Sequence, residues 1–102
     1  MEIRTKITGD KMEIVLKGRM DTNTSPEFEK EVFPKLEGIK EIILDMENLS
    51  YISSAGLRVV LLCQKKMNTA AGTMVVKNVN ELVMEVFSAT GFDTILTIEN
   101  ER

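Results

Sequence analysis

The sequence predicts an α/β fold in which α-helices pack on a mixed β-sheet, with elements in the order β-β-α-β-α-β-α-β. Two alternating apolar segments on either side of Gly9-Asp10 indicate an N-terminal hairpin. Strand-like and helix-like segments then alternate along the chain, and strand-helix-strand units place their strands parallel. The 102 residues, 43% of them hydrophobic, are enough for one core. We therefore expect a single domain over residues 1–102.

The first half of the chain is predicted to hold the hairpin and one helix. Apolar residues alternate within 3–7 and 12–16, as in half-buried strands. Side-chain caps before a proline predict a helix that begins near Thr24, which would form a capping box with Glu27. Pro34 should kink or shorten this helix. The apolar residues on its one face are Phe28, Val32, Phe33 and Leu36.

A buried strand and a long helix are predicted in the middle of the chain. Segment 39–46 carries a short apolar run that suits the central strand, and 47–52 is expected to be a connection. A serine cap predicts a helix over 55–69. The residues of this helix that we expect in the core are Leu57, Val60, Leu61 and Met67.

The last third of the chain is predicted to be strand, helix and edge strand. Residues 73–77 have a strand pattern, and Asn80 should cap a helix that ends at Gly91. Apolar residues within 95–98 suggest the final strand at an edge of the sheet. The apolar residues of the last helix are Leu82, Val83, Val86 and Phe87.

Composition argues against several classes of function. The net charge is −3, and no basic cluster is longer than Lys65-Lys66, so nucleic acid is not an expected partner. The chain has no histidine, the commonest metal ligand and general base. Its one cysteine, Cys63, is expected in the core, and the glycine-rich phosphate loops are absent. We therefore expect no catalytic residue, no metal and no cofactor, and a small enzyme is the least favoured alternative.

The hydrophobic patterning also bears on location. The longest apolar run, Val59 to Cys63, is far shorter than the roughly 20 residues of a membrane span. The first residues lack the apolar stretch of a secretory signal. These features predict a cytoplasmic protein that does not bind a membrane.

Serines and small residues gather where the central strand leads into the long helix. A serine at a helix start is either a cap or a phosphate acceptor, since the first turn leaves N–H groups unpaired and favours an anion. The residue types alone favour the cap. The small pair Ala55-Gly56 would leave the hydroxyl of Ser54 open to a modifying enzyme.

One stripe of the same helix carries Ser54, Arg58 and Leu62, which are spaced four residues apart. Leu62 is thus an apolar residue on a polar side of the helix. Two interpretations remain open for it: a neighbouring loop covers the side chain, or the side chain belongs to an interface.

The segment Ile52-Ser53-Ser54-Ala55-Gly56-Leu57-Arg58 resembles the STAS domain of anti-sigma factor antagonists. Gly18-Arg19-Met20-Asp21 and Asp45-Met46-Glu47-Asn48-Leu49 add to the resemblance, which implies a STAS-like mixed sheet. In that family, the unphosphorylated antagonist captures an anti-sigma factor and frees a sigma factor. The anti-sigma factor is also a serine kinase of the GHKL ATPase type, and it phosphorylates a serine in this motif.

For this chain, the resemblance implies a switch that is inactivated by phosphorylation at Ser54 and restored by a serine phosphatase. Many family members carry an aspartate immediately before the target serine, where this chain has Ser53, a rival acceptor. The alternative is a STAS scaffold subunit of a stress-signalling or lipid-transport complex. The residues expected to bind the partner are Asp21, Thr22, Asn23, Thr24, Ser53, Ala55, Gly56, Arg58 and Leu62.

Overall fold

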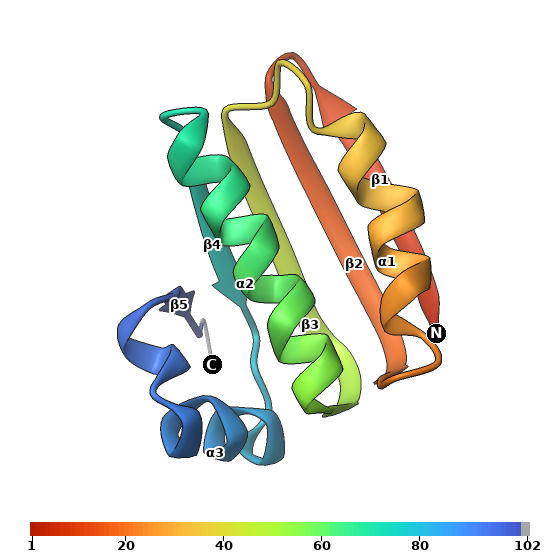
Figure 1. Cartoon of the computed structure of the whole chain (residues 1–102), viewed down its shortest axis with the longest axis vertical. Helices are drawn as coiled ribbons and strands as arrows, with labels where there is room; N and C mark the ends of the chain where they lie inside the picture. Colours follow the sequence, from red (N-terminus) through yellow and green to blue (C-terminus); the bar gives the residue numbers. More distant parts are fainter. Residues whose placement is uncertain (101–102) are drawn as a thin grey trace.

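A computed structural model describes residues 1–100, which form a five-stranded sheet in the order β1-β2-β3-β4-β5 (Figure 1). The hairpin pair β1 and β2 is antiparallel, and every later neighbour is parallel, so the predicted mixed sheet is confirmed. The strands are β1 Glu2–Thr8, β2 Lys11–Met20, β3 Glu41–Ile52, β4 Thr73–Lys77 and β5 Thr97–Glu99. The helices are α1 Ser25–Val32, α2 Ser54–Thr69 and α3 Glu81–Thr90.

The core lies between one face of the sheet and the helices. Ile14, Leu44 and Val76 are paired across β2, β3 and β4, and all three are fully buried. In Figure 1, α1 and α2 cross in front of this sheet, and α3 lies near the ends of the strands. Phe28 of α1 and Phe87 of α3 are also fully buried and complete the core.

The central strand is longer than the sequence predicted. The expected connection 47–52 is wrong, because β3 continues to Ile52, with Leu49 paired with Gly18 of β2. The register of β2 against β3 shifts between Val15 and Lys17 and again after Gly18. Such bulges interrupt the two-residue alternation on which the sequence argument depended.

Most predicted helix limits are confirmed. Helix α1 ends at Val32, and Pro34 lies in the 3-10 turn Phe33–Lys35 that follows, so the proline shortens the helix as expected. Asn80 caps α3 by accepting the Val83 N–H at 2.9 Å. No helix within residues 1–100 is long and apolar enough to cross a membrane.

One side chain expected in the core, Leu61 of α2, is only half-buried. Leu82, one of the apolar residues of the predicted last helix, is 53% exposed in α3. The face of α2 that meets the sheet carries Val59 and Cys63 instead, which are 1% and 0% exposed. Leu61 follows Ser54 by seven residues and so lies near the outer side of the helix. The final strand is also shorter than expected, because β5 begins only at Thr97.

Candidate partner-binding site

Parallel pairing of β2 and β3 brings the predicted site residues together at one edge of the sheet. The last residues of the two strands, Met20 and Ile52, are register partners. The next residue along, Ser53, donates its N–H to the Met20 carbonyl at 2.9 Å. The start of α2 therefore lies beside the loop that begins at Asp21. We call this region, which comprises residues 19–24 and 51–58, the β2–β3 edge.

The two neighbouring serines at this edge differ in structural role. Ser53 is the N-cap of α2: its backbone is extended, and its Oγ accepts the Gly56 N–H at 3.3 Å. Its carbonyl also accepts the Leu57 N–H. Ser54 is the first residue of the helix and is exposed, and within residues 1–100 its hydroxyl forms no hydrogen bond. The sequence predicted a serine cap, and the structure assigns that cap to Ser53.

Gly56 faces the interior and not the surface. A Cβ at this position would lie 2.7 Å from Ile52 Cγ1 and 2.9 Å from the Met20 carbonyl oxygen. The glycine therefore lets the first turn of α2 pack against the ends of β2 and β3. The expectation that Gly56 contacts the partner does not fit its buried position, whereas Ala55 remains partly accessible.

The loop after β2 is organised around the carboxylate of Asp21. Asp21 Oδ1 accepts the N–H groups of Asn23 at 2.9 Å and Thr24 at 3.0 Å. The Thr24 hydroxyl in turn accepts the Asp21 N–H at 2.8 Å and donates to the Arg19 carbonyl at 2.8 Å. Thr22 and Asn23 are exposed in this turn, so they are accessible to a partner.

The capping box predicted for Thr24 and Glu27 is wrong. Thr24 has a helical backbone with ψ −23°, and its side chain forms no cap hydrogen bond. Its hydroxyl is bound within the Asp21 turn instead. The Thr24 N–H lowers the pKa of Asp21 below its ordinary value, and further hydrogen bonds and the Arg19 charge act in the same direction, against a smaller opposing effect of burial. Asp21 therefore carries its negative charge at neutral pH.

Arg58 and Leu62 lie on the side of α2 that faces α1. Arg58 Nη1 is 3.8 Å from Glu29 Oε1 of α1, and Lys66 Nζ is 5.0 Å from the ring centre of Phe33. Leu62 lies one turn from each of these basic residues, so its half-buried side chain lies near the contact between α1 and α2. It is neither a core residue nor fully exposed, and its role in an interface stays a prediction.

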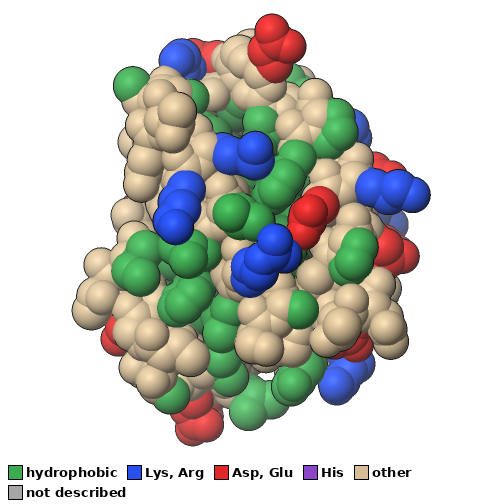
Figure 2. Space-filling view, viewed as in Figure 1, with side chains coloured by type: hydrophobic (Ala, Val, Ile, Leu, Met, Phe, Trp, Pro, Cys, Tyr) green, Lys and Arg blue, Asp and Glu red, His purple; other side chains and the backbone are tan. Residues whose placement is uncertain are grey.

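The accessible side of α2 is positively charged. The helix contains Arg58, Lys65 and Lys66, all exposed, and no aspartate or glutamate. Figure 2 shows basic side chains gathered over α2, with hydrophobic side chains beside them toward α3. The half-buried Leu61 adds apolar surface to this helix.

An arginine-tyrosine pair at the β2–β3 edge was not foreseen from the sequence. The guanidinium of Arg19 lies 4.2 Å from the ring centre of Tyr51, and its Nε is 3.9 Å from Asp21 Oδ2. Arg19 belongs to the motif already noted, but its partner Tyr51 was expected in a connection. Only the extended β3 reveals the contact, because it makes Arg19 and Tyr51 register partners.

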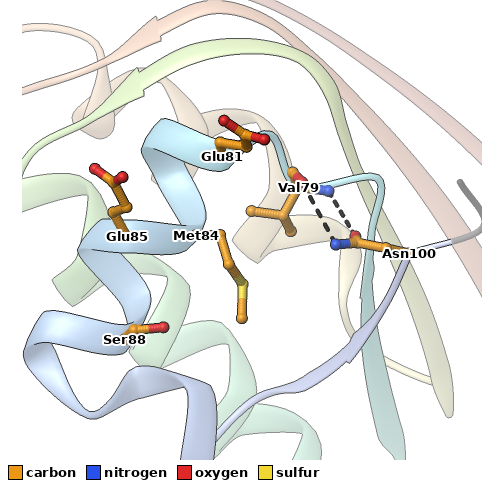
Figure 3. A pocket seen from close by; sticks show the side chains of 6 residues that line it. All are labelled: Val79, Glu81, Met84, Glu85, Ser88 and Asn100. Atoms are coloured by element: carbon orange, nitrogen blue, oxygen red, sulfur yellow. Dashed lines mark hydrogen bonds between the residues drawn. The ribbon is translucent and has the colours of Figure 1, made fainter.

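The remaining candidate chemistry lies away from this edge. A groove of about 420 Å³ runs between α3 and the residue after β5 (Figure 3). Among residues 1–100, the charged side chains that line it are the carboxylates of Glu81 and Glu85. Its lining residues are Val79, Glu81, Met84, Glu85, Ser88 and Asn100.

Two further observations concern reactive groups. Burial raises the pKa of the Cys63 thiol to about 12, so the thiol is not a nucleophile at neutral pH. Within residues 1–100, no three His, Cys, Asp or Glu side chains are grouped to hold a metal ion.

Comparison with known proteins identifies the family. The chain matches the STAS domain over residues 2–102. It is 35% identical over 102 residues to BtrV of Bordetella bronchiseptica, named as an anti-sigma factor antagonist, with 95% of this chain and 88% of BtrV covered.

Solved structures agree with this match in fold. The structure of an antagonist of the same description from Thermotoga maritima has a TM-score of 0.89 at 24% identity, covering 98% of this chain and 86% of that one. Phosphorylated SpoIIAA of Bacillus has a TM-score of 0.76 at 20% identity, covering 98% and 93%. The names of these relatives describe regulators and not enzymes. The chain therefore belongs to the STAS domain family, in the group of the anti-sigma factor antagonists.

Proposed function

We propose that this protein is a cytoplasmic, single-domain switch that captures an anti-sigma factor when unphosphorylated, and so releases a sigma factor. The anti-sigma factor is also the kinase that phosphorylates Ser54, and this modification ends the capture. A serine phosphatase restores the active form. ATP is bound by the kinase, since this chain lacks a glycine-rich phosphate loop.

The observation that carries the proposal is the difference between the two serines. Ser54 is exposed and its hydroxyl has no hydrogen bond within residues 1–100, so a kinase can reach it without breaking a contact. Ser53 is half-buried and its Oγ accepts the Gly56 N–H, so the kinase would have to draw this hydroxyl out of the cap to reach it. Losing a cap typically costs about 1 kcal/mol. This difference favours Ser54 as the acceptor.

The charge of α2 supplies a physical reason for release. A partner that docks on a helix surface bearing Arg58, Lys65 and Lys66 is expected to present acidic and apolar groups there. A phosphate on Ser54 adds about −1.5 to −2 charges beside this surface. It would face the partner's acidic groups, and a loss of only 1.4 kcal/mol weakens binding tenfold.

The test is phosphopeptide mapping of three proteins after reaction with the cognate kinase and ATP. Wild type and Ser53→Ala should carry phosphate on Ser54, whereas Ser54→Ala should carry none. Binding assays should find that Ser54→Ala holds the partner in the presence of ATP and that wild type releases it. Phosphate on Ser53 alone, or full affinity after complete modification of Ser54, would contradict the proposal.

A further inference from the structure

An ion pair between two helices lies next to the proposed phosphorylation site. Arg58 is one turn after Ser54 on the same exposed stripe of α2. Its guanidinium lies 3.8 Å from the carboxylate of Glu29 in α1, measured from Nη1 to Oε1. The side chain of Arg58 is 71% exposed and that of Glu29 is 39% exposed, so solvent weakens this contact.

A phosphate on Ser54 is a stronger acceptor than the Glu29 carboxylate for this guanidinium. It carries up to two negative charges and three oxygens, and it can bind the planar guanidinium through two hydrogen bonds. Side chains in a helix also lean toward its N-terminus, which directs Arg58 toward position 54. We infer that Arg58 leaves Glu29 of α1 and becomes the counter-ion of phosphorylated Ser54.

The other basic side chains are less well placed than Arg58 to pair with a phosphate on Ser54. Arg19 at the end of β2 has two contacts to give up, since its guanidinium lies 4.2 Å from the Tyr51 ring centre and its Nε lies 3.9 Å from Asp21 Oδ2. Lys65 follows Ser54 by eleven positions, about 16 Å along the helix, which exceeds the screening length of about 8 Å at physiological salt. Arg58 is therefore the cation of α2 best placed to meet the phosphate.

This exchange would give the modification a second effect at the partner-binding surface. Besides adding negative charge, it would engage the basic side chain one turn from Ser54 on α2 and make Arg58 less available to an acidic partner. It would also release Glu29 at the junction of α1 and α2. The inference rests on the proposed function only in taking Ser54 as the modified residue.

The test uses the full chain with phosphoserine incorporated at position 54 during synthesis, so no kinase is required. Phosphorus NMR follows the second ionisation of the phosphate, whose ordinary pKa is about 6. A nearby cation lowers this pKa, so Arg58→Gln should raise it and Arg58→Lys should restore part of the difference. Glu29→Gln should lower the phosphate pKa further, because the Glu29 carboxylate then no longer competes with the phosphate for Arg58.

Lys65→Gln is the matched control, since it removes one positive charge from the same helix at a greater distance. Arg58→Gln should raise the phosphate pKa by more than Lys65→Gln does, and this difference should decrease in 1 M salt. Equal effects of the two substitutions would overturn the assignment of Arg58, and an unchanged pKa in Glu29→Gln would contradict the exchange. If kinase mapping instead found no phosphate on Ser54, the proposed function would fail while this measurement remained valid.

Discussion

Replacing Gly56 by alanine tests whether this glycine serves the interior or the surface. The backbone of Gly56 is helical, so alanine meets no conformational penalty there and gains about 1 kcal/mol of helix propensity. The added Cβ would, however, lie 2.7 Å from Ile52 Cγ1, 2.9 Å from the Met20 carbonyl oxygen and 3.0 Å from Met20 Cγ. These distances are shorter than van der Waals contact.

The clash should outweigh the gain in propensity. The Met20 carbonyl oxygen also accepts the Ser53 N–H. Moving this oxygen away from the new methyl group would therefore weaken the hydrogen bond that connects the end of β2 to the start of α2. Overpacking a core typically costs about 1–3 kcal/mol. Because the clash involves a backbone oxygen, we place the cost at about 2–3 kcal/mol, which after the gain in propensity leaves a net loss of about 1–2 kcal/mol. For a domain of this size, such a loss lowers Tm by roughly 5–15 °C.

Urea and thermal unfolding measure this change, with Ser54→Ala as the control. Ser54 is exposed, so its replacement should change stability by less than about 0.5 kcal/mol. Folded Gly56→Ala should still accept phosphate on Ser54. A variant that keeps wild-type stability but is no longer phosphorylated would refute the packing role and would indicate that the kinase needs the glycine surface.

Three further substitutions, one of them a control, address the contact between α1 and α2 and the Asp21 turn. Leu62→Asp should abolish partner binding by calorimetry and lower Tm only moderately, because Leu62 is half-buried, whereas Val59→Asp, at a position 1% exposed, should prevent folding. Asp21→Asn should destabilise the protein at neutral pH, since the ionised carboxylate is the better acceptor for the Thr24 N–H. Because folding lowers the Asp21 pKa, its contribution is present above the ordinary value of 3.8 and is lost as pH falls through the lower folded value, so melting curves of wild type and variant should converge in acid.

Periodicity was sufficient to predict the order of the elements, because strands and helices bury every second or every third to fourth residue. It failed where the backbone departs from a regular repeat. In β3, Glu47 and Asn48 are both exposed, so the alternation breaks and the strand looks as if it ends. The bulged register against β2 absorbs that break, and only the three-dimensional pairing reveals it.

The sequence pattern alone could not decide which side chains cap the starts of α1 and α2. Thr24 and Ser53 both fit the pattern of an N-cap. Ser53 is the cap because extended backbone at this position aims its hydroxyl at the Gly56 N–H. Thr24 occupies the N-cap position of α1 without a side-chain cap, because its hydroxyl accepts the Asp21 N–H and donates to the Arg19 carbonyl.

The contacts that matter most for the proposed switch join distant parts of the chain. Arg58 meets Glu29 from another helix, and Arg19 meets Tyr51 from the neighbouring strand. No local pattern predicts such pairs, because they depend on how α1 and α2 pack on the sheet and on the register of β2 against β3. A helical wheel could group Ser54 with Arg58, but not reveal what Arg58 touches.

The placement of Ser54 also explains how the proposed switch could act without refolding. The first turn of α2 is anchored on its inner side, where Gly56 and Leu57 are buried and the Ser53 N–H bonds to Met20. Ser54 lies on the exposed side of the same turn. A phosphate there changes the charge at the surface and leaves those buried contacts in place. The physical basis of release is then electrostatic, because the modified protein keeps the shape of the docking surface and loses its complementary charge.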